Sequence, residues 1–173
     1  MRPSFVTYLV ILGGGVLWCA GLVLAPVLLS EGGVPGLLGG SLYQFFHPIC
    51  HQLEGRSFHI LGEPVAVCIR CSSIYFAFLA GTVLFPLVGQ FTRTICSRGD
   101  LLMYAVLPMV VDVLLDELGI HSSTGITRMI TGTVFGFVVP FYIIPTAQEA
   151  VEELLSASRF FSPSAVKKGS LHA

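Results

Sequence analysis

The feature that most constrains this chain is an uncharged stretch that runs without interruption from Pro3 to Ser30. About 20 apolar residues are enough for a helix to cross a bilayer, so this stretch predicts a membrane-spanning helix. It is longer than the apolar core of a secretory signal peptide, and no A-x-A cleavage site follows it. Trp18 directly before Cys19 also disagrees with a lipoprotein signal, so we expect the helix to be retained as an anchor.

The composition agrees with a lipid environment. Hydrophobic residues make up 54% of the 173 residues, and charged residues make up 11%. A soluble domain carries about 25% charged residues, and a chain of this length has too small an interior to hide so much apolar surface from water. We therefore predict the lipid bilayer as a partner, whereas the net charge of -1 gives no reason to expect a nucleic acid.

The predominantly apolar segments predict an all-α, polytopic membrane protein with about four transmembrane helices. The predicted spans belong to a single domain, residues 1–148, and lie near residues 4–30, 71–92, 101–118 and 128–146. Between the first two spans we expect a Gly- and Pro-rich loop at 31–40 and a short interfacial helix at 41–50. Residues 149–173 are expected to form a cytoplasmic tail.

The distribution of Lys and Arg predicts the orientation, because cytoplasmic segments carry an excess of both. With the N-terminus inside, the cytoplasmic segments hold six such residues: Arg2, Arg93, Arg98, Arg159, Lys167 and Lys168. The opposite side holds three: Arg56, Arg70 and Arg128. We therefore expect a multi-pass protein of the cell membrane with both termini cytoplasmic, so that the polar loop before the second span faces outward.

A cluster of cysteine and histidine residues precedes the second span. Cys68 and Cys71 have the C-x-x-C spacing with which two thiolates bind one ion, and Cys50 and His51 can add further ligands. His47 is either another ligand or an interfacial histidine. A Cys3His set is a common structural zinc site, and a site with only three protein ligands leaves one position open for water or substrate. We therefore predict a metal site, with zinc as the ion and iron as the alternative.

Two other interpretations of the cysteines stay open. On the outer face, two of them can form a plain disulfide, and Cys68 with Cys71 can form a redox-active pair. The total of five cysteines argues against a framework built only of paired disulfides. Cys19 and Cys96 lie in or near apolar segments, so we interpret them as small hydrophobic residues.

Asp112 and Asp116 interrupt the third predicted span and, being four residues apart, share one helix face. Ionisable groups inside a span face the bundle interior and need partners, and Arg70 and Arg128 begin the neighbouring spans at about the same level. One interpretation is a buried Asp–Arg network that holds the bundle together. The other is a polar pocket in which Arg56, Arg70 and Arg128 hold an anionic group. In that pocket Asp112 and Asp116 are the candidate catalytic residues.

The segment before the fourth span predicts a helix cap, formed by Ser122, Ser123 or Thr124. A triad of Ser122, His121 and Asp116 is conceivable, but no nucleophile-elbow or oxyanion motif supports it. Within the fourth span, Gly132 and Gly136 form a G-x-x-x-G pattern, which is typical of close helix packing.

Several of these motifs occur together in a known family. The sequence has Cys50-His-Gln, Arg56-Ser-Phe and Cys68-Ile-Arg-Cys71, followed by Tyr75, Gly81, Pro108, Asp112, Arg128, Thr131 and Gly132. Over residues 43–136 it resembles the uncharacterised membrane protein family known as domain of unknown function 2085. The resemblance implies a polytopic membrane protein, and it implies no particular activity. The residues that it implies to be important are Cys50, His51, Arg56, Cys68, Arg70, Cys71 and Asp112.

The chain departs from the family pattern at two places. Ser72 and Ser73 stand where the family usually has a glycine after C-x-R-C, which raises the question of how tightly the second span packs. Glu117 stands where a glutamine is expected, which puts a hydrogen-bonding role at that position in doubt.

Three functions are compatible with these motifs, and whether the protein is an enzyme stays open. The first is a metal-binding membrane protein, in which the zinc is structural or activates water against a lipid-linked or small anionic substrate. The second is a membrane thiol-disulfide oxidoreductase that uses Cys68 and Cys71. The third is a small transporter or non-catalytic subunit in which Asp112 and Asp116 form an ion or proton path, and such a thin bundle would need to form a homo-oligomer.

Overall fold

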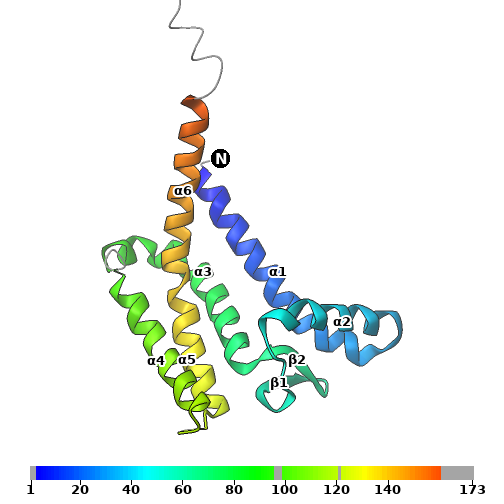
Figure 1. The fold of residues 1–173 in the computed structure, drawn as a ribbon. Coiled ribbons are helices and arrows are strands. Elements are labelled where there is room, and N and C mark those ends of the chain that lie inside the picture. Colours follow the sequence, from blue (N-terminus) through cyan, green and yellow to red (C-terminus); the bar gives the residue numbers. More distant parts are fainter. Residues whose placement is uncertain (1–2, 96–98, 121, 161–173) are drawn as a thin grey trace, which may run out of the picture.

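The computed structural model describes residues 3–95, 99–120 and 122–160, which form six helices and one small sheet (Figure 1). The helices are α1 (Pro3–Glu31), α2 (Gly33–Phe46), α3 (Ile69–Ile95), α4 (Asp100–Glu117), α5 (Gly125–Val138) and α6 (Pro140–Phe160). Two 3-10 turns, η1 (His47–Ile49) and η2 (Glu54–Arg56), precede the strands β1 (Ser57–Ile60) and β2 (Glu63–Cys68). His121 and Cys96 lie outside the described residues, so the candidate triad and one predicted hydrophobic cysteine have no structural description.

Three helical segments of the described chain are long and apolar enough to cross a membrane: Ser4–Glu31, Ile69–Val88 and Gly125–Ala157. The last of these contains α5 and most of α6. Large apolar side chains on these segments are exposed, among them Leu17 at 76% and Leu87 at 81%, as expected for surfaces that contact lipid. The predicted fold class, a helical membrane protein with several spans, is therefore confirmed.

The helix α4 is not one of the three segments, although it coincides with the third predicted span. Its 18 residues include four acidic ones: Asp100, Asp112, Asp116 and Glu117. Each charged residue near the centre of a span costs several kcal/mol, on the order of 3. A fourth span over α4 therefore stays a prediction that depends on how these carboxylates are neutralised.

The segment after α1 differs from the prediction. Residues 31–40 were expected to form a loop before an interfacial helix at 41–50, but helix α2 already begins at Gly33 and ends at Phe46. The chain reverses at Gly32 and Gly33, which have φ angles of 68° and 58°. The glycine content serves close packing of α2 on α1, since a Cβ at Gly39 would lie 2.7 Å from the backbone nitrogen of Leu29.

A β-hairpin between α2 and α3 was not predicted. The two strands pair antiparallel, with Ser57 opposite Cys68 and Ile60 opposite Glu63. Leu61 and Gly62 both have positive φ angles, 55° and 88°, as a two-residue type I′ turn requires. The hairpin and α2 lie at one end of the bundle, whereas the start of α1 and the end of α6 lie at the other (Figure 1).

The helices α3 and α5 pack closely, and the G-x-x-x-G pattern forms their contact. A Cβ at Gly132 would lie 2.7 Å from the carbonyl oxygen of Arg70, and one at Gly136 would overlap the backbone of Ile74. This confirms the packing role that the pattern predicts. The packing also accommodates Ser72 and Ser73, which are buried on α3 and donate hydrogen bonds to the carbonyls of Val67 and Ile69.

The predicted tail begins inside helix α6, which continues past residue 148 to Phe160. Gln148 donates from Nε2 to the carbonyl oxygen of Ser4 at 2.9 Å. This hydrogen bond ties α6 to the first turn of α1. Residues 161–173 lie outside the described part of the chain.

Candidate functional site

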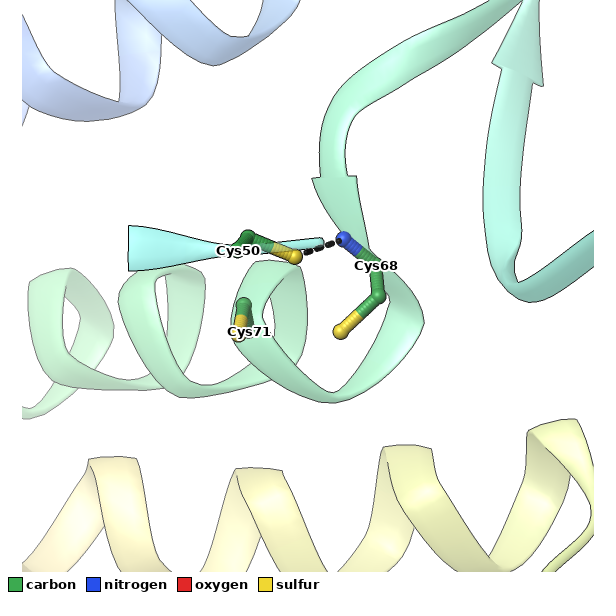
Figure 2. Close-up of side chains that lie close together, drawn as sticks. All are labelled: Cys50, Cys68 and Cys71. Atoms are coloured by element: carbon green, nitrogen blue, oxygen red, sulfur yellow. Dashed lines mark hydrogen bonds between the residues drawn. The ribbon is translucent and has the colours of Figure 1, made fainter. Parts of the chain in front are cut away.

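Three cysteines from three different elements meet at the junction between the hairpin and α3. Cys50 follows η1, Cys68 ends β2, and Cys71 lies in the first turn of α3. Their Sγ atoms all lie within 4.8 Å of one another, and all three residues are free thiols (Figure 2). The backbone nitrogen of Cys68 donates a hydrogen bond to Sγ of Cys50 at 3.1 Å.

The cluster favours the thiolate form of at least one of its members. Cys68 lies outside the membrane-spanning segments, and hydrogen bonds from the Cys50 and then the Cys71 side chains hold the pKa of its thiol well below the usual range. The thiolate is the form that acts as a metal ligand and as a nucleophile. Both a metal site and a redox-active pair are compatible with this property.

Gln52 fixes the loop that carries Cys50, a role that the sequence analysis, which named this residue only within the Cys50-His-Gln motif, did not predict. Its Nε2 donates to the carbonyl oxygens of Tyr43 at 2.7 Å and Ala66 at 2.8 Å, so that one side chain joins α2 to β2. Gln52 has a φ angle of 50°, a strained value for a residue other than glycine. Its place directly after Cys50-His51 was the available signal, but nothing in the sequence identifies its two acceptors.

The histidines do not join the thiol cluster. Among the described residues, neither His47 nor His51 has a ring nitrogen within the group formed by the three sulfurs. Both are exposed, and His51 lines the cavity beside the cluster. The predicted set of four or five ligands therefore reduces, in this geometry, to three cysteines with one histidine nearby.

The predicted Asp–Arg network is present and joins α3, α4 and α5. Arg70 pairs with Asp112, and the hydroxyl of Ser123 donates to both Asp112 oxygens at 2.9 and 3.0 Å. Nη2 of Arg128 lies 3.0 Å from Oδ2 of Asp116. The backbone nitrogen of Ser123 donates to Oδ1 of Asp116 at 3.0 Å, so that this residue joins both carboxylates.

Ser123 was predicted only as a possible helix cap. Thr124 is the residue that caps α5, because its side chain accepts a hydrogen bond from the backbone nitrogen of Thr127 at 3.2 Å. Ser123 is thereby free to serve the carboxylates of α4. The sequence motif Ser-Ser-Thr contained the cap but did not show which member faces the network.

The thiol cluster and the network share one cavity of about 300 Å³. Its walls come from the Cys50 loop, from α3 and from the facing ends of α4 and α5, and the lining includes Cys50, His51, Arg56, Cys68, Arg70, Cys71, Asp116, Glu117 and Arg128. Asp112 does not line it, although it pairs with Arg70. All three predicted metal-binding cysteines and all three predicted anion-binding arginines therefore face the same space.

The fold and the site together define a helical, multi-pass membrane protein with a thiol cluster beside an Asp–Arg network at one end of the bundle. Residues 50–142 match the model of a family described as predicted membrane protein (DUF2085), and the chain belongs to this family. An uncharacterized protein of Methanocaldococcus jannaschii is 33% identical over 147 residues, which cover 83% of this chain and 94% of that relative. No solved structure matches the chain. The resemblance stated from the sequence motifs is thus confirmed.

Proposed function

We propose that this protein is a membrane metalloprotein that holds one zinc ion with Cys50, Cys68 and Cys71. The observation that carries the proposal is the convergence of the three sulfur atoms within 4.8 Å of one another. Thiolates at the usual Zn–S distance of about 2.3 Å in a tetrahedral site lie about 3.8 Å apart, so small side-chain adjustments suffice. The hydrogen bond from the Cys68 backbone nitrogen to Cys50 Sγ supports the same assignment, because such contacts orient ligands.

A site with three protein ligands leaves one coordination position open, which is typical of catalytic zinc. The cavity beside the cluster favours this arrangement over a closed structural site, because the cavity also contains a carboxylate, Asp116, and a buried cation, Arg128. Zinc with an open position supplies Lewis acidity. His51 is the candidate for a fourth ligand if the site is structural. The neighbouring charges favour a small or lipid-linked anionic substrate.

We place the site at the outer face of the cell membrane, with α4 as a fourth span and with both termini cytoplasmic. The excess of Lys and Arg in the segments on the other side of the membrane from the site supports this orientation. The separation of the hairpin from the start of α1 and the end of α6 supports it as well (Figure 1). The ion pairs of Asp112 and Asp116 offset part of the cost of placing α4 in lipid.

Elemental analysis of the protein purified from cells tests the metal. We expect about one zinc per chain in the wild type and its loss in Cys50→Ser, because two thiolates hold zinc far more weakly than three. Cys19→Ser is the matched control, since Cys19 is also a buried free thiol but lies outside the cluster. If the wild type and Cys50→Ser contain equal amounts of metal, the proposal is wrong.

A thiol-disulfide oxidoreductase is the second candidate, and the lowered pKa of Cys68 beside Cys71 favours it. Counting free thiols before and after mild reduction separates the two functions. Stable thiolates with bound zinc support the metalloprotein, whereas a Cys68–Cys71 disulfide that forms and breaks reversibly supports the oxidoreductase. A transporter based on Asp112 and Asp116 receives less support, because both carboxylates are already paired with arginines.

A further inference from the structure

We infer that Arg56 and Arg128 form a binding site for a phosphate-type oxyanion, on the cavity wall that contains Asp116 and lies beside the cysteines. The inference deepens the proposed function and rests on it for the zinc ion, whose open position this anion would face. The arginine site itself depends only on the charges, contacts and burial of described residues.

The three arginines of the cavity are not equivalent. Arg70 has a carboxylate of its own, because Asp112 pairs with it and the single Ser123 hydroxyl proton is shared between the two Asp112 oxygens. Arg70 and Asp112 thus form a pair whose charges cancel, although Nε of Arg70, like that of Arg128, has no hydrogen-bond partner among the described residues. Because this pair holds α3 to α4, we assign ligand recognition to the two arginines that have no carboxylate of their own.

Arg56 and Arg128 share a single carboxylate. Nη1 of Arg56 lies 3.5 Å and Nη2 of Arg128 lies 3.0 Å from the same Asp116 oxygen, Oδ2. Two guanidinium groups therefore share one carboxylate, and neither has a carboxylate of its own. Glu117 also lines the cavity, but it is exposed and forms no ion pair with either arginine among the described residues. Asp116 also accepts from the Ser123 backbone nitrogen, so its other oxygen is occupied as well.

The Arg128 guanidinium lies where solvent cannot screen its charge fully. The Arg128 side chain is only 8% exposed, and among the described residues its Nε donor has no hydrogen-bond partner. A buried, incompletely bonded guanidinium is costly unless an acceptor reaches it. Arg56 is 49% exposed and lines the same cavity, so that a ligand can enter on its side.

The geometry and size of the site indicate the class of ligand. Guanidinium groups bind phosphate and carboxylate through paired, charge-assisted hydrogen bonds, and two converging guanidiniums suit the several oxygens of a phosphate. The cavity of about 300 Å³ lies at the lower limit of ligand pockets. We therefore expect one phosphate group, either free or as the head of a lipid.

Calorimetric titration of the full chain in a nonionic detergent tests this site, with inorganic phosphate and with short-chain phosphatidic acid as separate ligands. We expect saturable binding that Arg56→Gln weakens about tenfold or more, since a lost charged hydrogen bond costs about 1.5–3 kcal/mol. Arg56 is half-exposed, so this variant is expected to fold. Binding of inorganic phosphate indicates a soluble ligand, and binding of phosphatidic acid alone indicates a lipid headgroup.

Removing a nearby negative charge is expected to change the affinity for the anion in the opposite direction, and a second glutamate outside the cavity provides the matched control. Glu117 lines the cavity and is exposed, so Glu117→Gln removes a repulsive charge and is expected to tighten binding. Glu54 is also exposed but does not line the cavity, and Glu54→Gln is expected to leave binding unchanged. If neither ligand binds, or if Arg56→Gln binds both as well as the wild type does, the inference is overturned.

The same titration on protein with and without metal separates this inference from the proposed function. Phosphate binding that depends on Arg56, in wild-type protein that contains no zinc when purified from cells, supports the anion site and contradicts the metalloprotein. Bound zinc together with no binding of either ligand supports the metalloprotein and overturns the anion site.

Discussion

Arg128 on α5 and Asp116 on α4 form an ion pair, with 3.0 Å between Nη2 and Oδ2, and both side chains line the cavity that holds the cysteines. In the described structure α4 packs mainly on α5, and this pair and the neighbouring Arg70–Asp112 pair add to what holds α4 in place. The same contacts that secure the helix therefore also shape the cavity. Substitutions in the network are expected to affect stability and site together.

Asp112→Asn is expected to destabilise the protein by about 1–3 kcal/mol, because Arg70, whose side chain is only 18% exposed, loses its counter-charge. The double variant Arg70→Met with Asp112→Leu is expected to recover much of this loss, since it removes both charges. Thermal unfolding in detergent measures these variants together with the single variants Arg70→Met and Asp112→Leu. Additive effects of the two substitutions would show that the pair is not coupled.

Ser123→Ala is expected to lower stability by about 1–3 kcal/mol, because the hydroxyl that serves both Asp112 oxygens is lost. Ser122→Ala is the matched control, since Ser122 is the adjacent serine and is exposed. Its unfolding midpoint is expected to equal that of the wild type. Equal shifts in the two variants would contradict the assignment of Ser123 to the network.

Gly136→Ala is expected to separate α3 from α5, because the added Cβ would overlap the backbone of Ile74. Overpacking of this kind costs about 1–3 kcal/mol. Gly13→Ala in α1 is the control, since a Cβ there has no atom within 4 Å and alanine favours a helix. A melting temperature lowered by Gly136→Ala alone, in a thermal unfolding experiment, checks the contact.

Removal of zinc by a strong chelator is expected to lower the melting temperature of the wild type. An ion that binds only the folded state contributes about 2.7 kcal/mol when its free concentration is 100 times its Kd. Cys50→Ser, which is expected to hold no zinc, should melt at the same temperature with and without chelator. A wild type that is insensitive to chelator while still losing its metal would show that the ion does not support the fold.

Sequence and structure agree best where one physical constraint dominates. Uninterrupted apolar runs predicted the spans in α1, α3 and α5–α6, because lipid tolerates few charges in a helix. The G-x-x-x-G pattern predicted a close contact, and the structure shows that its partner is the backbone of α3 at Arg70 and Ile74. The loop predicted at residues 31–40 was wrong, because its glycines from Gly33 onward lie in helix α2. Glycine allows close helix packing as well as turns, so its presence alone does not distinguish the two.

The sequence predicted which residues lie together at the site, but not which of them pair with one another. The motif spacing gave Cys50, Cys68 and Cys71 as one group, and the i, i+4 spacing put Asp112 and Asp116 on one face. The roles of Gln52 and Ser123 depend on acceptors that are distant in the chain, such as Ala66 and Asp112. Local patterns do not contain such contacts.

The uncharged run with which the chain begins is enough by itself to determine a helical membrane protein, because the cost of exposing backbone and charge to lipid leaves few other folds. Only the tertiary structure decided that β2, α3, α4 and α5 bring the thiols and the arginines to one cavity. It also decided that Arg70 is neutralised by its own carboxylate while Arg56 and Arg128 share one. The spacing of charges along a sequence does not determine which arginine pairs with which carboxylate. That pairing depends on which helices are in contact and on the position along each helix at which they meet.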